Sequence, residues 1–218
     1  MNKYAFIFDM DGVIVDSNPF HKISLRQFCA RYGFDLTEED LLKKIYGRTN
    51  KEWIPNLFGK LPSEQVKAYG AEKEALFREI YKEDIVALKG LEVFLKLVQK
   101  AGFPLAIGTS APRDNVNFTL SKTNLNDYFP VILDETFVDH GKPNPEIYLK
   151  TAAALDKDPK DCIVFEDSLS GVAAGKAAGC KVVGVTTTHT PDELAETDYV
   201  IDDFLDLNPE TLVRSLFG

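Results

Sequence analysis

Long hydrophobic runs, closely spaced cysteines and an excess of basic residues are all missing from this chain of 218 residues. No apolar run approaches the length of a membrane-spanning helix, so we expect no membrane partner. The run Tyr4–Phe8 is too short for a signal peptide, and acids follow it at once. The three cysteines, Cys29, Cys162 and Cys180, show neither Cys-x-x-Cys nor histidine-spaced metal patterns. We therefore expect reduced thiols, mostly in the core of a cytoplasmic protein.

The charge balance disfavours another class of partner. The chain has 25 Lys and Arg against 34 Asp and Glu, a net charge of −9. An acidic protein is a poor match for nucleic acid or an anionic membrane, although a local cationic pocket could still bind a small anion. With 44% apolar and 27% charged residues, the composition is typical of a globular chain with a sizeable core. We expect one domain, or one domain with an insertion, and a monomer by default.

Apolar, β-branched runs alternate with helix-like segments along most of the chain. Such near-continuous apolar runs are typical of strands buried on both faces of a parallel sheet. The predicted strands are Tyr4–Phe8, Phe103–Gly108, Val131–Leu133, Cys162–Phe165, Lys181–Val185 and Tyr199–Ile201. The helices expected between them cover Leu91–Val98, a start near Pro112, Pro145–Leu155 and Ser168–Ala178. The alternation favours a doubly wound α/β domain.

The stretch from about Ser17 to Lys82 breaks this alternation, because it contains no convincing strand. Its pattern predicts helices at Pro19–Tyr32, Thr37–Ile45, Asn50–Leu57 and Ser63–Tyr81. Thr37 and Ser63 have the character of helix N-caps. The stretch therefore reads as a helical insertion after the first strand.

Two polar clusters follow the first two predicted strands, at the edge where open α/β sheets bind ligands. Asp9 and Asp11 can point to the same side of the backbone. Two such carboxylates could bind a hard cation such as Mg²⁺, and one could act as a nucleophile; a capped turn with solvated acids is the alternative. Thr109 and Ser110 precede a helix start and could hold phosphate oxygens, although a simple N-cap explains the same residues.

Two further clusters follow later in the chain. Lys142 lies in the segment Gly141–Pro145, whose prolines stiffen the loop and could aim the lysine at an anion with little ordering cost. A surface turn with the lysine in solvent is the alternative. Glu166 and Asp167 follow an apolar strand and precede a possible helix cap at Ser168. Acids that are merely favoured by a helix N-terminus are the alternative there.

In this order the four clusters resemble the motifs of the haloacid dehalogenase superfamily, and within it the subgroup of β-phosphoglucomutase and sugar-phosphate phosphatases. The segments that carry the likeness are Asp9-Met-Asp-Gly-Val-Ile-Val-Asp-Ser17, Gly141-Lys-Pro-Asn-Pro145 and Glu166-Asp-Ser168. The resemblance spans essentially the whole chain. It implies a Rossmann-like, three-layer α/β core with a parallel sheet, residues 1–16 and 84–218. It also implies a small helical-bundle cap domain, residues 17–83.

The resemblance also implies an activity, that of a Mg²⁺-dependent phosphatase acting on a small phosphorylated metabolite, a sugar phosphate above all. Asp9 would attack phosphorus and form an aspartyl phosphate, and Asp11 would act as general acid and base. Thr109 and Lys142 would bind the transferring phosphoryl group.

The metal site and the substrate-binding residues are likewise implied by the resemblance. Mg²⁺ would be held by Asp9, the main-chain carbonyl of Asp11 and Asp167, with Glu166 as a further ligand or just behind the ligands. The implied substrate-binding residues are His21, Gly47, Arg48, Thr49 and Lys73 in the cap, and Ser110, Ala111, Arg113 and Asn115 after the second core strand. The alternative activity is that of β-phosphoglucomutase, which interconverts β-glucose 1-phosphate and glucose 6-phosphate. A non-catalytic binding module is a third reading.

Overall fold

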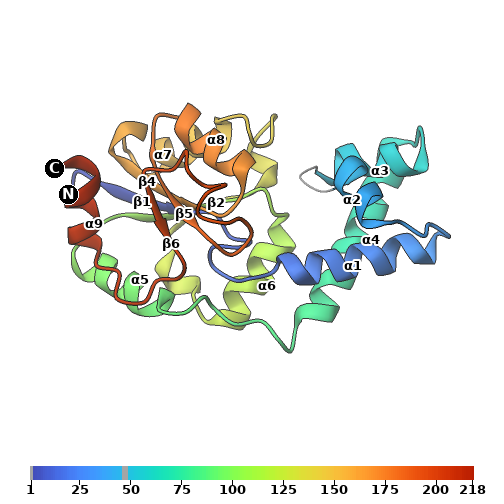
Figure 1. Cartoon of the computed structure of the whole chain (residues 1–218), viewed down its shortest axis with the longest axis horizontal. Helices are drawn as coiled ribbons and strands as arrows, with labels where there is room; N and C mark the ends of the chain where they lie inside the picture. The colour runs from blue at the N-terminus through green and yellow to red at the C-terminus, as the bar shows by residue number, and fades with distance from the viewer. Residues whose placement is uncertain (1, 46–48) are drawn as a thin grey trace. The chain divides into compact units, whose positions relative to one another are not determined.

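A computed structural model describes residues 2–45 and 49–218. The chain divides into two compact units, one formed by Met1–Asp16 with Ile85–Gly218 and the other by Ser17–Asp84. The first is an α/β unit and the second is a bundle of helices (Figure 1). Among the helices of the described residues, none is long and apolar enough to cross a membrane.

The α/β unit is built on one parallel sheet, and all the predicted strands are present. Within the described residues the strands are β1 (Ala5–Phe8), β2 (Leu105–Gly108), β3 (Val131–Leu133), β4 (Cys162–Glu166), β5 (Lys181–Val185) and β6 (Tyr199–Ile201). Their order is β3-β2-β1-β4-β5-β6, and each neighbouring pair is parallel. The direction of winding reverses between β1 and β4. Open sheets bind ligands at such a switch point, outside the carboxyl ends of the strands.

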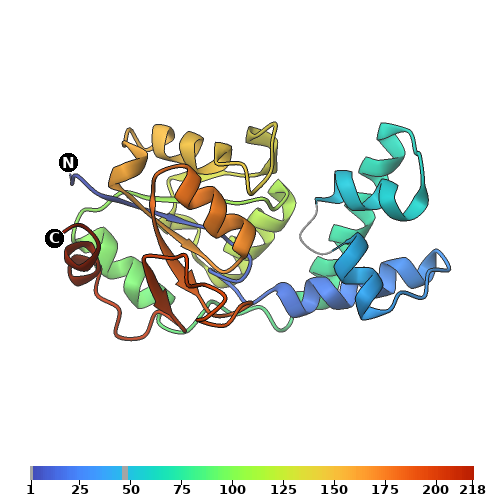
Figure 2. The ribbon, with the colours of Figure 1, turned by 45° about the horizontal axis from the view of Figure 1, so that its top comes forward.

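Helices cover both faces of this sheet (Figures 1 and 2). They are α5 (Leu91–Lys100), α6 (Arg113–Thr123), α7 (Glu146–Ala154), α8 (Leu169–Ala177) and α9 (Pro209–Phe217), joined by 3-10 turns η1 (Asn126–Tyr128), η2 (Glu135–Phe137) and η3 (Pro159–Asp161). Helix α7 packs on β1, β2 and β3, α8 packs on β4 and β5, and α5 packs with α9. Helix α9 was not predicted, although Asn208 caps it by accepting from the Thr211 N–H at 3.0 Å.

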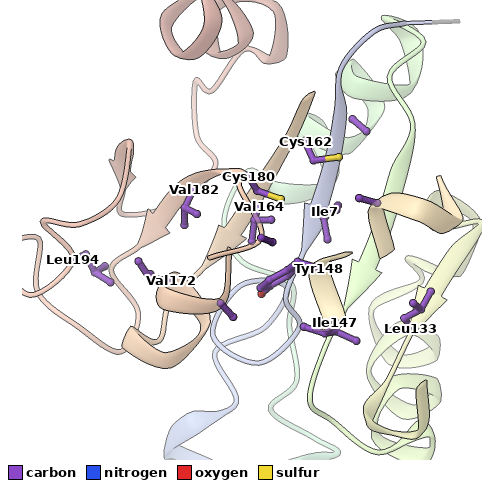
Figure 3. Packing of buried hydrophobic residues seen from close by; sticks show 14 residues of the cluster. Ile7, Leu133, Ile147, Tyr148, Cys162, Val164, Val172, Cys180, Val182 and Leu194 are labelled. Atoms are coloured by element: carbon purple, nitrogen blue, oxygen red, sulfur yellow. The ribbon is translucent and has the colours of Figure 1, made fainter. Parts of the chain in front are cut away.

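Strand β1 shows why the sheet is buried on both sides, because successive side chains point to opposite faces. Ile7 lies in the cluster of buried residues that α7 and α8 cover, together with Val164 (Figure 3). Phe6 and Phe8 point the other way. They join an aromatic cluster formed with Phe94, Phe103, Phe129, Phe165 and Phe204. This packing on both faces fixes the end of β1, where Asp9 follows.

The helical unit contains α1 (Asn18–Arg31), α2 (Glu38–Lys44), α3 (Asn50–Phe58) and α4 (Ser63–Tyr81), as the sequence predicts. Its core includes Phe28 and Trp53. Thr37 caps α2 through a capping box with Asp40. The predicted cap at Ser63 is wrong: Pro62 takes the N-cap position and Ser63 is the first helical residue.

The three cysteines are buried free thiols, as expected from their spacing. Burial raises the pKa of Cys162 to about 12 and that of Cys180 to about 12. These thiols therefore stay protonated and pack as small apolar side chains.

The two glycines at the ends of α5 give a matched test of the packing beside this helix. Both have a left-handed backbone, but a Cβ on Gly90 would lie 2.5 Å from the Leu205 nitrogen, whereas a Cβ on Gly102 would meet nothing within 4 Å. Each change to alanine costs roughly 1–2 kcal/mol for the backbone conformation. Gly90→Ala must also displace the facing backbone, so we expect it to lower the free energy of unfolding by about 1 kcal/mol or more beyond Gly102→Ala. Urea unfolding measures both, and equal losses would contradict this close approach.

Candidate active site

Asp9 directly follows β1 at the switch point of the sheet. Its backbone N–H donates to the Phe165 carbonyl at 3.0 Å, which extends the pairing of β1 with β4 by one residue. The chain then turns sharply: the Met10 carbonyl accepts from Ile14 at 2.8 Å, and Gly12 has a φ of 76°. Asp9 is thus held in place with its residue only 7% exposed.

Gly12 provides the space that Asp167 occupies. A Cβ on Gly12 would lie 2.0 Å from Asp167 Oδ2, so a larger residue here would displace the carboxylate. The loop after β5 holds both partners: the Thr187 hydroxyl donates to the Gly12 carbonyl at 2.5 Å, and the Thr188 hydroxyl donates to Asp167 Oδ2. Sequence reasoning missed these threonines. The available signal was a run of hydroxyl residues, Thr186–Thr188, directly after a predicted strand.

Lys142 is buried beside two carboxylates rather than exposed in a surface turn. Its Nζ lies 2.9 Å from Asp9 Oδ1 and 2.5 Å from Glu166 Oε1, and its side chain is 7% exposed. Burial alone would lower the pKa of Lys142, but the charges of Asp9 and Glu166 outweigh burial and hold this pKa above its usual value. Lys142 is therefore a fixed cation at the end of the sheet.

Glu166 is the last residue of β4, one position further than the predicted end of that strand, and it is fully buried. Its Oε1 accepts from Lys142 and from the Tyr148 hydroxyl, the latter at 2.6 Å. Its Oε2 accepts from the backbone N–H groups of Asp167 and Ser168, both at 3.1 Å, and from the Ser168 hydroxyl at 3.0 Å. Burial would raise the pKa of Glu166, but Lys142 and these donors lower it below the usual value. Glu166 is therefore an anion.

The three acids Asp9, Glu166 and Asp167 can each place a carboxylate oxygen within 4.8 Å of the others. Burial raises the pKa of Asp9 to about 7 although Lys142 acts against it, and burial with the charges of Glu166 and Asp9 raises the pKa of Asp167 well above its usual value. Three buried acids beside a single lysine also leave an excess of negative charge at this edge of the sheet. A divalent cation would offset it, and an all-oxygen set of carboxylates suits Mg²⁺. The residues present therefore fit a metal ion of this kind.

Thr109 reaches the same edge of the sheet from the neighbouring strand. Phe8 of β1 pairs with Ile107 of β2, so Asp9 and Thr109 both leave adjacent strands at their carboxyl ends. The buried Thr109 hydroxyl accepts from the Ala111 N–H at 3.1 Å. Ser110 is exposed, whereas Ala111 is buried. Asp11, two residues past Asp9, is half-buried.

Arg113 and Asn115 lie in the first turn of α6. Arg113 Nε lies 2.5 Å from Oδ2 of the fully buried Asp134, and Nη2 donates to the Ile132 carbonyl at 3.3 Å. The guanidinium also lies 5.9 Å from the centre of the Phe137 ring. Asn115 is fully buried. The charge of Arg113 is thus already balanced by Asp134, and a role for either residue in substrate binding stays a prediction.

The helical unit brings His21 and Lys73 together, although they are 52 residues apart in the chain. Lys73 Nζ lies 2.9 Å from His21 Nδ1 and donates to Glu74 Oε1 at 2.9 Å. The His21 ring stacks on Phe77 with 3.7 Å between ring centres. Lys73 is therefore buried and paired rather than solvated.

Of the other residues predicted for the cap, Thr49 stands at the start of α3. Glu52 accepts from its N–H at 2.8 Å and from its hydroxyl at 2.9 Å. Gly47 and Arg48 lie outside the described residues.

Known proteins resemble the chain along nearly its whole length. Residues 6–185 match the haloacid dehalogenase-like hydrolase family, so the chain belongs to this family. It is 36% identical over 187 residues to a phosphorylated carbohydrates phosphatase of Thermotoga maritima, which covers 83% of this chain and 84% of that protein. A haloacid dehalogenase hydrolase of Entamoeba histolytica (family IA, variant 3) superposes with a TM-score of 0.90 at 30% identity, over 99% of this chain and 100% of that one. A β-phosphoglucomutase of Clostridium difficile superposes with a TM-score of 0.84 at 26% identity, over 99% and 97%. The family and subgroup predicted from the sequence are confirmed.

The threonines after β5 allow a test of whether Asp167 holds a metal ion. Thr188→Val removes the hydroxyl that donates to Asp167 and keeps the branched shape of the side chain. We expect Mg²⁺ affinity to fall about 10-fold, since groups that orient ligating carboxylates contribute 10- to 100-fold. Calorimetric Mg²⁺ titration measures this. Thr186→Val is the matched control, because that hydroxyl donates to Asp202 instead, at 2.6 Å. Equal Mg²⁺ affinity in the wild type and both variants would contradict a role of Asp167 as a metal ligand that Thr188 orients.

Proposed function

We propose that the chain is a phosphoric monoester hydrolase, a Mg²⁺-dependent phosphatase that acts on a small phosphorylated carbohydrate through an aspartyl phosphate. The observation that carries this proposal is Lys142 held between Asp9 and Glu166 at the switch point of the sheet. A phosphate ester adds negative charge beside several acids, so it needs a fixed cation at its binding site. The likeness to a phosphorylated carbohydrates phosphatase supports the same substrate class.

In this proposal Asp9 and Asp11 carry the bond changes. The Asp9 carboxylate attacks phosphorus, the bond to the ester oxygen breaks, and the leaving oxygen takes a proton from Asp11. Asp11 then removes a proton from a water molecule as that water attacks the same phosphorus. This second step releases inorganic phosphate and restores the Asp9 carboxylate. The half-buried Asp11 lies within the turn from Met10 to Ile14, and its partial exposure to solvent suits it to carry protons.

Phosphoryl transfer depends mainly on positioning and on neutralising charge. Lys142 and Thr109 would hold the phosphoryl oxygens from two sides of the Asp9 carboxylate. Mg²⁺, when bound, would neutralise the charge on the phosphoryl group. Asp9, Asp167 and the main-chain carbonyl of Asp11 would hold this ion, with Glu166 as a further ligand or just behind the ligands.

We also propose that the helical unit sets substrate preference. The candidates are His21, Gly47, Arg48, Thr49 and Lys73, together with Ser110, Ala111, Arg113 and Asn115 of the α/β unit. The charges of Lys73 and Arg113 are already balanced by Glu74 and Asp134. Cations that are already paired with a carboxylate suit the hydroxyls of a carbohydrate better than they suit a second phosphate. We therefore favour a substrate with a single phosphate group.

The second candidate function is that of β-phosphoglucomutase, favoured by the likeness to the Clostridium difficile enzyme. A screen of phosphorylated carbohydrates with Mg²⁺ separates the two. We expect release of inorganic phosphate from one or more sugar phosphates, with no isomer formed from β-glucose 1-phosphate in the presence of a bisphosphate primer. Formation of glucose 6-phosphate without free phosphate would replace the phosphatase proposal by the mutase.

Replacing the proposed nucleophile gives the most direct mutational test. Asp9→Asn keeps the size of the side chain but removes the charge that attacks phosphorus, so we expect phosphate release to fall at least about 1,000-fold. Asp192→Asn, in an exposed segment, is the control and should retain the wild-type rate. Rates of phosphate release at saturating Mg²⁺ measure the effect. Unchanged turnover in Asp9→Asn would remove Asp9 from this role.

A further inference from the structure

Tyr148 of α7 contacts the site from inside the core. It is fully buried in the cluster on the face of the sheet that α7 and α8 cover. Figure 3 shows it in the middle of this cluster, among Ile7, Ile147 and Val164. A phenylalanine would fill nearly the same volume, so packing explains the ring of Tyr148 but not its hydroxyl. A hydroxyl in such surroundings needs a partner, and here it donates to Glu166 Oε1 at 2.6 Å.

The same oxygen of Glu166 is shared with Lys142. Lys142 Nζ lies 2.5 Å from Oε1 and 5.0 Å from the centre of the Tyr148 ring. Tyr148 therefore contacts both members of the Glu166–Lys142 pair, the anion through its hydroxyl and the cation through its ring face. The other carboxylate oxygen of Glu166 is held by Asp167 and Ser168, so Glu166 has little freedom to reorient.

We propose that Tyr148 is a positioning residue for phosphoryl transfer, because its hydroxyl limits how strongly Glu166 holds Lys142. With two donors on Oε1, Glu166 anchors Lys142 yet leaves its amine 2.9 Å from Asp9, where the phosphoryl group would bind. Without the tyrosine hydroxyl, the buried Oε1 has one donor fewer. Lys142 is then drawn towards Glu166 and interacts less with the phosphoryl group. This inference rests on the function proposed above.

Tyr148→Phe tests the inference by two measurements. We expect the affinity for inorganic phosphate, measured by calorimetry at saturating Mg²⁺, to fall about 10-fold, because the variant loses the hydrogen bond from the Tyr148 hydroxyl to the charged Glu166. We expect kcat for hydrolysis of p-nitrophenyl phosphate to fall with it.

Thr151→Val is the matched control for loss of a buried hydroxyl. Thr151 is fully buried in the same helix, and its hydroxyl donates to the Ile147 carbonyl at 2.7 Å. This variant should lose thermal stability while keeping wild-type phosphate affinity and kcat. The inference is overturned if Tyr148→Phe keeps wild-type phosphate affinity and kcat, or if Thr151→Val loses as much of both.

A double variant tests whether Tyr148 acts through Glu166. Glu166→Gln removes the charge through which Tyr148 is inferred to act. Adding Tyr148→Phe to Glu166→Gln should therefore change phosphate affinity by no more than about twofold. A further drop of about 10-fold would show that Tyr148 acts by another route and would overturn the inference.

Binding of inorganic phosphate needs no turnover, so the two proposals fail separately. If the wild type binds phosphate more tightly than Tyr148→Phe but hydrolyses no ester, the proposed function fails, whereas the part of Tyr148 in positioning Lys142 for phosphate binding stands. If the wild type hydrolyses esters and Tyr148→Phe equals it in phosphate affinity and kcat, the positioning role alone fails. A wild type that neither binds inorganic phosphate at saturating Mg²⁺ nor hydrolyses an ester overturns both.

Discussion

One buried ion-pair network, in which Lys142 lies between Asp9 and Glu166, holds together the polar side chains at the carboxyl ends of β1 and β4. Carboxylates at the tip of an apolar strand are costly unless a counter-charge and hydrogen bonds accompany them. Lys142 supplies the counter-charge. The Tyr148 hydroxyl and the backbone N–H groups of Asp167 and Ser168 supply hydrogen bonds to the two oxygens of Glu166. Negative charge remains on Asp9 and Asp167. It lies where the proposed metal site and the proposed substrate site meet.

The position of these charges follows from the apolar sheet beneath them. β1 and β4 are neighbours whose side chains pack on both faces, and Phe8 stacks on Phe165 at 4.7 Å between ring centres. Glycines then allow the polar groups to approach the backbone. A Cβ on Gly12 would overlap Asp167, and a Cβ on Gly171 would lie 1.8 Å from Glu166 Oε1. The geometry of the site thus depends as much on missing side chains as on the acids themselves.

Sequence patterns predict the strands and the acids at their ends well, because parallel strands end at one edge of a sheet and a polar residue after an apolar run marks that edge. The state of Lys142 could not be predicted from the residues alone, since a buried lysine and a surface turn share the same Gly-Lys-Pro pattern. In the sequence, Tyr148 looks like an ordinary core residue of a helix. The partner of its hydroxyl becomes known only from the structure, which places Glu166 beside it. The contact between His21 and Lys73 depends on how α1 and α4 pack together. The hydrophobic periodicity of each helix alone does not predict this packing. Helix α9 was missed although Asn208 and Pro209 are typical of a helix start.

The proposed mechanism requires that Asp9 becomes covalently phosphorylated during turnover. Rapid acid quenching followed by peptide mapping can detect this intermediate. The wild-type protein is mixed with Mg²⁺ and a phosphorylated carbohydrate that it hydrolyses and that carries a radiolabelled phosphoryl group. We expect transient label on the peptide that contains Asp9, which appears before free phosphate and disappears when the substrate is exhausted. Release of labelled phosphate at the full rate with no label on that peptide at any time would contradict it, because water would then attack the ester directly.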